Sequence, residues 1–125
     1  MLRRKPRKIV LESGLYLWRV HHRHAASGCS EVFSAFAARR ERTNLRIVFP
    51  ETTEHGSGFP RQAGVVVDYS APSWSLNLNL PSAARLLIEL ALSGGWDADC
   101  GREHVIDNGY LFLRERRTSL NMFGS

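Results

Sequence analysis

Residues 80–96, Leu-Pro-Ser-Ala-Ala-Arg-Leu-Leu-Ile-Glu-Leu-Ala-Leu-Ser-Gly-Gly-Trp, form the most strongly patterned stretch of the chain. Pro81 suits the first position of a helix, where its missing N–H costs no hydrogen bond. Gly94 and Gly95 suit a stop just beyond the last turn. The polar residues between these ends recur at helical spacing and share one narrow stripe: Ser82, Arg85, Glu89 and Ser93. The stretch therefore predicts one long helix that is apolar around most of its circumference and is covered on more than one side.

The two faces of this helix lead to different expectations. Leu87 and Ile88 lie opposite the polar stripe, so we expect both to be fully buried and Leu87→Ala to cost about 2–5 kcal/mol. Leu86 and Leu90 flank the stripe and make the apolar arc wider than one sheet face needs. Because monomers seldom expose large apolar patches, the sequence predicts a homodimer that buries Leu86 and Leu90. The alternative cover is the loop around Phe59.

The rest of the chain reads mainly as strands, because β-branched and aromatic residues recur in short runs between turn signals. Residues 31–38 also contain two phenylalanines at a helical spacing, but this run can pair with residues 45–49 across a charged turn. We therefore favour a strand there, and we interpret residues 25–30 and 50–64 as loops. The predicted strands are residues 8–12, 15–21, 31–38, 45–49, 65–69 and 74–80.

After the helix, Asn108-Gly109 separates two β-like runs at 104–107 and 110–113. An Asn-Gly pair in this position is typical of a two-residue hairpin turn, in which both residues need positive φ. The sequence therefore predicts a β-hairpin after the helix, and we expect Gly109→Val to be markedly destabilising.

These elements define an α+β fold class with two layers, an antiparallel β-sheet of hairpins packed on one long α-helix. The length of 125 residues suits a single core. We expect a disordered basic tail at residues 1–7, a single domain at 8–117, and a frayed C-terminal tail at 118–125. Repelling charges and a proline give the first segment few core contacts.

The composition excludes some functional classes. The apolar fraction of 43% and the charged fraction of 23% are ordinary for a globular chain. No apolar run approaches the length of a membrane span or a secretion signal, so we expect a cytoplasmic protein. In that compartment Cys29 and Cys100 are expected to be free thiols. The formal charge of +5 comes from the first eight residues, which argues against a nucleic-acid partner for the neutral domain behind them.

Two short patterns resemble those of a group of small uncharacterised bacterial proteins. Residues 16–20 read Tyr-Leu-Trp-Arg-Val in an early strand, and residues 91–96 read Ala-Leu-Ser-Gly-Gly-Trp at the end of the helix. Members of the group usually have a proline shortly after Gly-Trp, whereas this chain continues with Asp97-Ala98-Asp99. The resemblance implies a fold class and a bacterial source, and it transfers no catalytic residue.

A histidine-rich segment provides the candidate metal ligands. On a strand, His22 and His24 share one face, which is a common way for a sheet to present two imidazoles to a metal. A third ligand would come from a carboxylate or from one of four residues: His55, His104, Cys29 or Cys100. The alternative interpretation is a polar strand end before a loop. No cofactor and no catalytic residue are predicted.

Three functional hypotheses follow from these observations. The first is a non-enzymatic binding or interaction domain with a protein or small-molecule partner, accessory to a mobile or defence-related locus. Its expected interaction residues are Arg19, Leu86 and Leu90. Arginine is enriched at interfaces, and Arg19 points away from the core if its neighbour Trp18 is buried. The second is a small metal-dependent hydrolase that uses the two histidines. The third is a nucleic-acid binder that uses the basic N-terminal tail.

Overall fold

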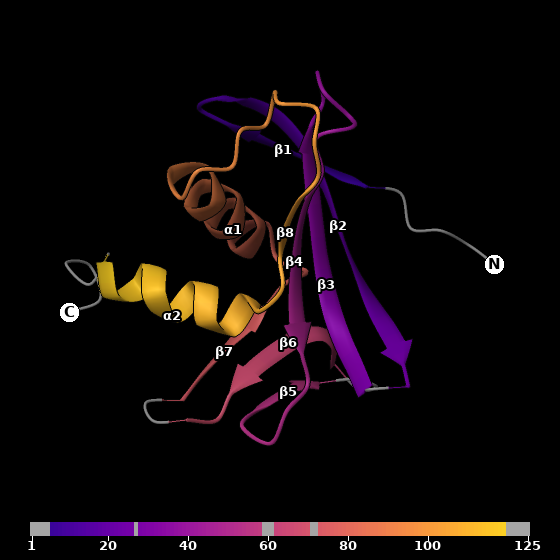
Figure 1. Ribbon diagram of the computed structural model, residues 1–125, viewed down its shortest axis with the longest axis vertical. Coiled ribbons are helices and arrows are strands. Elements are labelled where there is room, and N and C mark those ends of the chain that lie inside the picture. Colours follow the sequence, from indigo (N-terminus) through magenta and orange to yellow (C-terminus); the bar gives the residue numbers. More distant parts are fainter. Residues whose placement is uncertain (1–5, 27, 59–61, 71–72, 120–125) are drawn as a thin grey trace.

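The computed structural model describes residues 6–26, 28–58, 62–70 and 73–119. A five-stranded sheet runs through the molecule in the order β1-β2-β3-β4-β8 (Figure 1). The first four strands pair with one another in antiparallel fashion, and β8 is parallel to β4. The strands are β1 (Arg7–Leu11), β2 (Gly14–Ala25), β3 (Gly28–Ala37), β4 (Leu45–Pro50) and β8 (His104–Ile106).

A second, three-stranded antiparallel sheet lies near the end of β2 and the start of β3 (Figure 1). It consists of β5 (His55–Gly58), β6 (Gln62–Asp68) and β7 (Trp74–Asn77). Two loops of the sequence interpretation are therefore wrong in part. Residues 25–30 contain the end of β2 and the start of β3, and residues 50–64 contain β5 and the start of β6. Phe59, which belongs to the loop named as the alternative cover for the helix, lies outside the described residues.

The predicted central helix is present as α1 (Pro81–Ser93). Leu80 precedes it in an extended conformation, and Pro81 occupies the first turn as expected. At the other end, the backbone N–H of Gly94 donates to the carbonyl of Leu90. The burial prediction for this helix is confirmed, because Leu87 and Ile88 are both 0% exposed.

The prediction of a single helix is wrong, because a second helix, α2 (Gly109–Ser119), follows β8. Asn108 caps this helix instead of forming a hairpin turn, since its side-chain Oδ1 accepts a hydrogen bond from the N–H of Leu111 at 3.1 Å. Gly109 has no positive φ. It is glycine for a different reason, since a Cβ at this position would collide with the ring of Phe49. Of the predicted frayed tail at residues 118–125, the first two residues belong to α2, and residues 120–125 lie outside the described part.

Both helices lie on the same side of the five-stranded sheet (Figure 1). Alternation along β2 explains this arrangement, because Tyr16, Trp18 and Val20 point into the core while the residues between them point the other way. The second helix adds Tyr110 and Leu113 to the same core. Among the described residues, neither helix combines the length and apolar character that crossing a membrane requires.

Candidate functional site

The buried row on β2 changes from apolar to polar where β2 and β3 approach their connecting turn. Along this row Val20 is paired with Phe33 in the strand register. The next pairs on the same face are His22 with Glu31 and His24 with Cys29. Because side chains of directly opposite residues lie on the same side of a sheet, these four polar residues continue the surface that forms the core.

The four side chains contact one another in two cross-strand pairs. His22 Nδ1 lies 2.5 Å from Glu31 Oε2, and the Glu31 side chain is 1% exposed. His24 Nδ1 lies 3.2 Å from Cys29 Sγ. The two imidazole rings meet edge to face with centroids 4.5 Å apart. The structure thus brings the two predicted metal-ligand histidines together and adds a thiol and a buried carboxylate.

Of the third ligands that the sequence left open, Cys29 is the one beside the two histidines. His22, His24 and Cys29 each offer one ligand atom, and these atoms lie within 4.8 Å of one another. Cys100 is a separate exposed thiol near the carbonyl of Arg102, and both cysteines are free. His104 is on β8.

The sequence contained a signal for this cluster that the interpretation of residues 25–30 as a loop obscured. If β2 and β3 are joined by a tight turn between Ala25 and Gly28, positions at equal distances from that turn face each other. His24 then faces Cys29, and His22 faces Glu31. The pattern His-x-His, turn, Cys-x-Glu would have pointed to the same four side chains.

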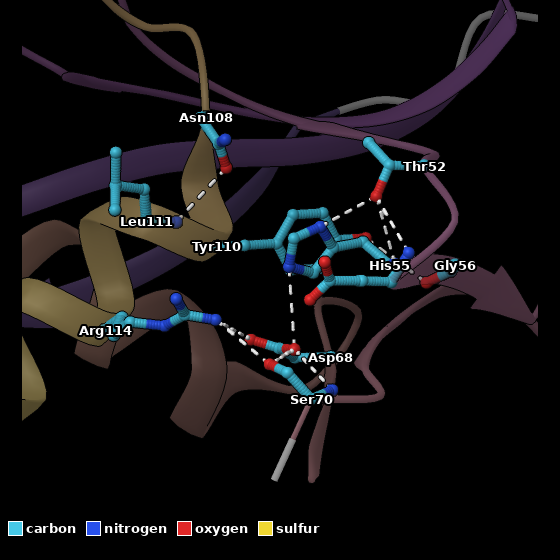
Figure 2. Close-up of polar contacts among 10 residues, drawn as sticks. Thr52, His55, Gly56, Asp68, Ser70, Asn108, Tyr110, Leu111 and Arg114 are labelled. Atoms are coloured by element: carbon cyan, nitrogen blue, oxygen red, sulfur yellow. Dashed lines mark hydrogen bonds and ion pairs between the residues drawn. The ribbon is translucent and has the colours of Figure 1, made fainter.

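A second polar cluster surrounds Asp68, which ends β6 and is 1% exposed (Figure 2). Its Oδ1 accepts hydrogen bonds from the backbone N–H of Ser70 at 3.0 Å and from the Ser70 hydroxyl. Arg114 on α2 donates to Asp68 Oδ2 at 3.2 Å, and His55 Nε2 on β5 lies 3.5 Å from Asp68 Oδ1. Burial alone would raise the pKa of Asp68, but the hydrogen bonds of Ser70 and Arg114 and the charge of His55 hold it below the ordinary value.

His55 is held on its other side by Thr52 and Tyr110 (Figure 2). Thr52 Oγ1 lies 2.9 Å from His55 Nδ1, and the imidazole stacks on the Tyr110 ring with centroids 4.0 Å apart. The Tyr110 hydroxyl donates to the carbonyl of Gly56 at 3.2 Å. Burial, with the nearby charges of Glu31 and Asp68, raises the pKa of Tyr110 above its ordinary value, so the phenol stays neutral.

The Thr52–His55–Asp68 sequence of contacts resembles a catalytic triad in composition, but the surrounding geometry indicates a structural role. Thr52 Oγ1 also accepts hydrogen bonds from the backbone N–H groups of Glu54 and His55, at 3.2 and 3.1 Å. An oxygen that caps a turn in this way has its lone pairs engaged and is a poor nucleophile. We therefore interpret this cluster as a tie between the small sheet and α2.

The face of the five-stranded sheet that points away from the helices carries the predicted interaction residue Arg19. Arg23 follows it on β2, and Arg46 lies on β4 with an ion pair to Glu103 at 3.0 Å. Burial lowers the pKa of His21, and the charges of these three arginines lower it further. We call this surface the outer face; it comprises the outward residues of β1, β2, β3, β4 and β8.

Exposed apolar side chains lie at both edges of the outer face. Val10 and Leu15 face each other on β1 and β2, and they are 70% and 37% exposed. Val105 on β8 is paired with Arg46 in the strand register and is 43% exposed. Val32 is buried near the centre. The exposed surface is thus basic in the middle and apolar at the edges.

The other two predicted interaction residues lie on α1 and differ in exposure. Leu90 is 5% exposed and belongs to the core, whereas Leu86 is 37% exposed. Part of the apolar arc that suggested a dimer is therefore covered within one chain. The homodimer stays a prediction, and it would have to use Leu86 without Leu90.

Comparisons with protein-family models, with curated proteins and with solved structures find no match to this chain. The outer face and the polar end of β2 and β3 are therefore the two regions from which we infer a function.

Proposed function

We propose that the protein is a non-enzymatic interaction domain that binds a partner protein through the outer face. The observation that carries the proposal is the basic row of Arg19, Arg23 and Arg46 on a sheet face that no described helix covers. Exposed arginine beside exposed aliphatic side chains is the composition of many protein interfaces. Charge complementarity then favours a partner whose contact surface is acidic.

A pocket at one side of the outer face supports a protein partner over a nucleic acid. It is lined by Arg19, Ser34, Phe36 and Glu41, among other residues. The Glu41 carboxylate would repel phosphate groups. The pocket lining also includes Trp18, which is only 1% exposed. In the described strands, Phe36 is the one Phe, Tyr or Trp that the register places on this face, so two exposed rings for stacking successive bases are not found there.

The test is capture of partners from a lysate of the native host with three matched variants. Arg19→Glu changes the basic centre and Val105→Asp changes an apolar edge. Arg42→Glu makes the same charge change on the exposed turn after β3, outside the outer face. We expect one protein to bind the wild type and Arg42→Glu and to be lost from both outer-face variants, all of which should keep their thermal unfolding midpoint.

Two results would contradict this proposal. One is a partner that all the variants retain equally. The other is tight binding of single-stranded nucleic acid that falls steeply with salt, because that result would assign the arginines to phosphate recognition. If a partner is found, its identity would also test the finer suggestion that the domain serves a mobile or defence-related locus.

A further inference from the structure

We propose that the polar end of β2 and β3 is a binding site for a divalent transition metal of the zinc class, with His22, His24 and Cys29 as ligands. The three potential ligand atoms lie within 4.8 Å of one another. They come from two strands whose register is fixed by pairing on both sides of the site, from Tyr16 with Ala37 to Ala25 with Gly28. The positions of the ligands therefore follow from the sheet and do not depend on a long loop.

The donor set selects the metal. Two imidazole nitrogens and one thiolate sulfur suit Zn²⁺ and its borderline-soft neighbours, whereas Mg²⁺ and Ca²⁺ prefer oxygen ligands. Three protein ligands leave one tetrahedral position for water or for a ligand from another molecule. His24 is exposed and Cys29 is partly exposed, so the metal can enter from solvent without opening the core.

Glu31 provides the second observation that points to a ligand site. Its carboxylate is 1% exposed and lies 2.5 Å from Nδ1 of His22. A carboxylate that accepts the Nδ1–H bond fixes the tautomer and directs Nε2 toward a metal, which is the usual outer-shell arrangement for a ligating histidine. Glu31 is thus a positioning residue, and the burial of a charged group at this point has a function beyond packing.

Metal binding at this site would also stabilise the fold. A metal held by His22 and His24 on β2 and by Cys29 on β3 cross-links the two strands close to their turn. Binding to the folded chain alone stabilises it by mass action. The inference does not depend on the proposed interaction function, since the ligands lie on the face of the sheet opposite Arg19.

Cobalt is the probe for the test, because Co²⁺ occupies zinc sites and reports its ligands by absorption. Tag-free protein, kept reduced, is titrated with Co²⁺ and then with Zn²⁺. We expect one equivalent to bind, with the visible spectrum of a four-coordinate ion and a near-ultraviolet charge-transfer band from thiolate. Zn²⁺ should abolish both signals by displacement.

The variants identify the ligands. Cys29→Ala should lose the charge-transfer band and His24→Ala should weaken binding, whereas the matched controls Cys100→Ala and His104→Ala should bind as the wild type does. Arg19→Glu should also bind normally, which separates this site from the outer face. The proposal is overturned if Co²⁺ binding does not saturate at one equivalent, or if the thiolate band survives Cys29→Ala and disappears with Cys100→Ala.

Discussion

Each of the two sheets of this protein contains one cross-strand histidine–carboxylate pair. His22 faces Glu31 across β2 and β3, and His55 faces Asp68 across β5 and β6. Both carboxylates are 1% exposed and both imidazoles are mostly buried. Their neighbours differ: Asp68 is also bound by Ser70 and by an arginine from α2, whereas His22 has a second imidazole and a thiol beside it.

We interpret the difference as one local unit, a buried carboxylate beside a histidine, in two different roles. Where additional donors converge on the carboxylate, the unit ties separate elements together, as Asp68 ties β6 to Arg114 on α2. Where additional ligand atoms gather beside the imidazole, the carboxylate orients a ligand, as we propose for Glu31. The two carboxylates are equally buried and both lie close to a histidine, so these properties do not distinguish the two roles. The other side chains around each pair do.

Removing the Asp68 carboxylate should have the largest effect on stability. Asp68→Ala leaves Arg114 and Ser70 without their acceptor, and we expect a loss of roughly 2–4 kcal/mol, reduced from the cost of a fully buried pair because Arg114 is half-exposed. Urea unfolding measures this loss. The control is Asp99→Ala, which breaks the exposed pair with Arg39 and should leave the midpoint nearly unchanged.

Lowering the pH should remove the contribution of the Asp68 carboxylate to the free energy of unfolding without a mutation. Since the pKa of Asp68 is lower in the folded protein than its ordinary value of 3.8, the unfolded chain binds more protons in that region and stability rises with pH. The contribution is complete above the ordinary value and is lost as the pH falls through the folded pKa. The stability gap between wild type and Asp68→Asn, measured by urea unfolding, should therefore narrow below about pH 4. A constant gap down to pH 2 would contradict this account.

Glu31→Gln should affect metal binding more than stability. The amide can still accept a hydrogen bond from His22, so we expect a minor change in the metal-free unfolding midpoint. Loss of the outer-shell charge should weaken Co²⁺ binding by about 10–100-fold, and competition titration measures this change. Asp68→Asn should leave Co²⁺ affinity unaltered at neutral pH. If the two variants behaved alike in both assays, the proposed division between the pairs would be wrong.

The smallest expected effect is that of Arg114→Gln. Its side chain is 54% exposed, so water replaces much of what the guanidinium gives to Asp68, and we expect a loss below about 1 kcal/mol. Thermal unfolding in low and high salt should show a smaller difference in high salt. A loss as large as that of Asp68→Ala would mean that Arg114 is the main partner in the tie.

The elements that the sequence predicted well are those whose signals are local. Pro81, the polar stripe and the two glycines placed α1 correctly, and the stripe also identified Leu87 and Ile88 as core. The prediction of a hairpin was wrong at residues 109–119 because an Asn-Gly pair fits either a hairpin turn or the start of a helix. Only the contact of Gly109 with Phe49, a residue distant in the sequence, decides between them.

The candidate sites could be predicted only in part for a related reason. His22 and His24 share a face by strand periodicity alone, so sequence reasoning could pair them. Cys29 and Glu31 join them through the register of β3, which depends on where the turn falls. The Asp68 cluster forms only because α2 reaches the second sheet, and no sequence pattern around Asp68 predicts its contact with Arg114.

The parallel pairing of β8 with β4 has a consequence for synthesis on the ribosome. Leu45 is paired with His104, so the edge of β4 stays unpaired until a segment that is translated much later has been made. The hydrogen bond from Arg114 to Asp68 can form only later still, because Arg114 follows β8 in the sequence. Until residues 104–119 have emerged, the nascent chain presents an unpaired strand edge, the kind of surface that associates with other chains. Completion of the fold is therefore expected to be a late, post-emergence event, and chaperone binding during translation should be strongest in that interval.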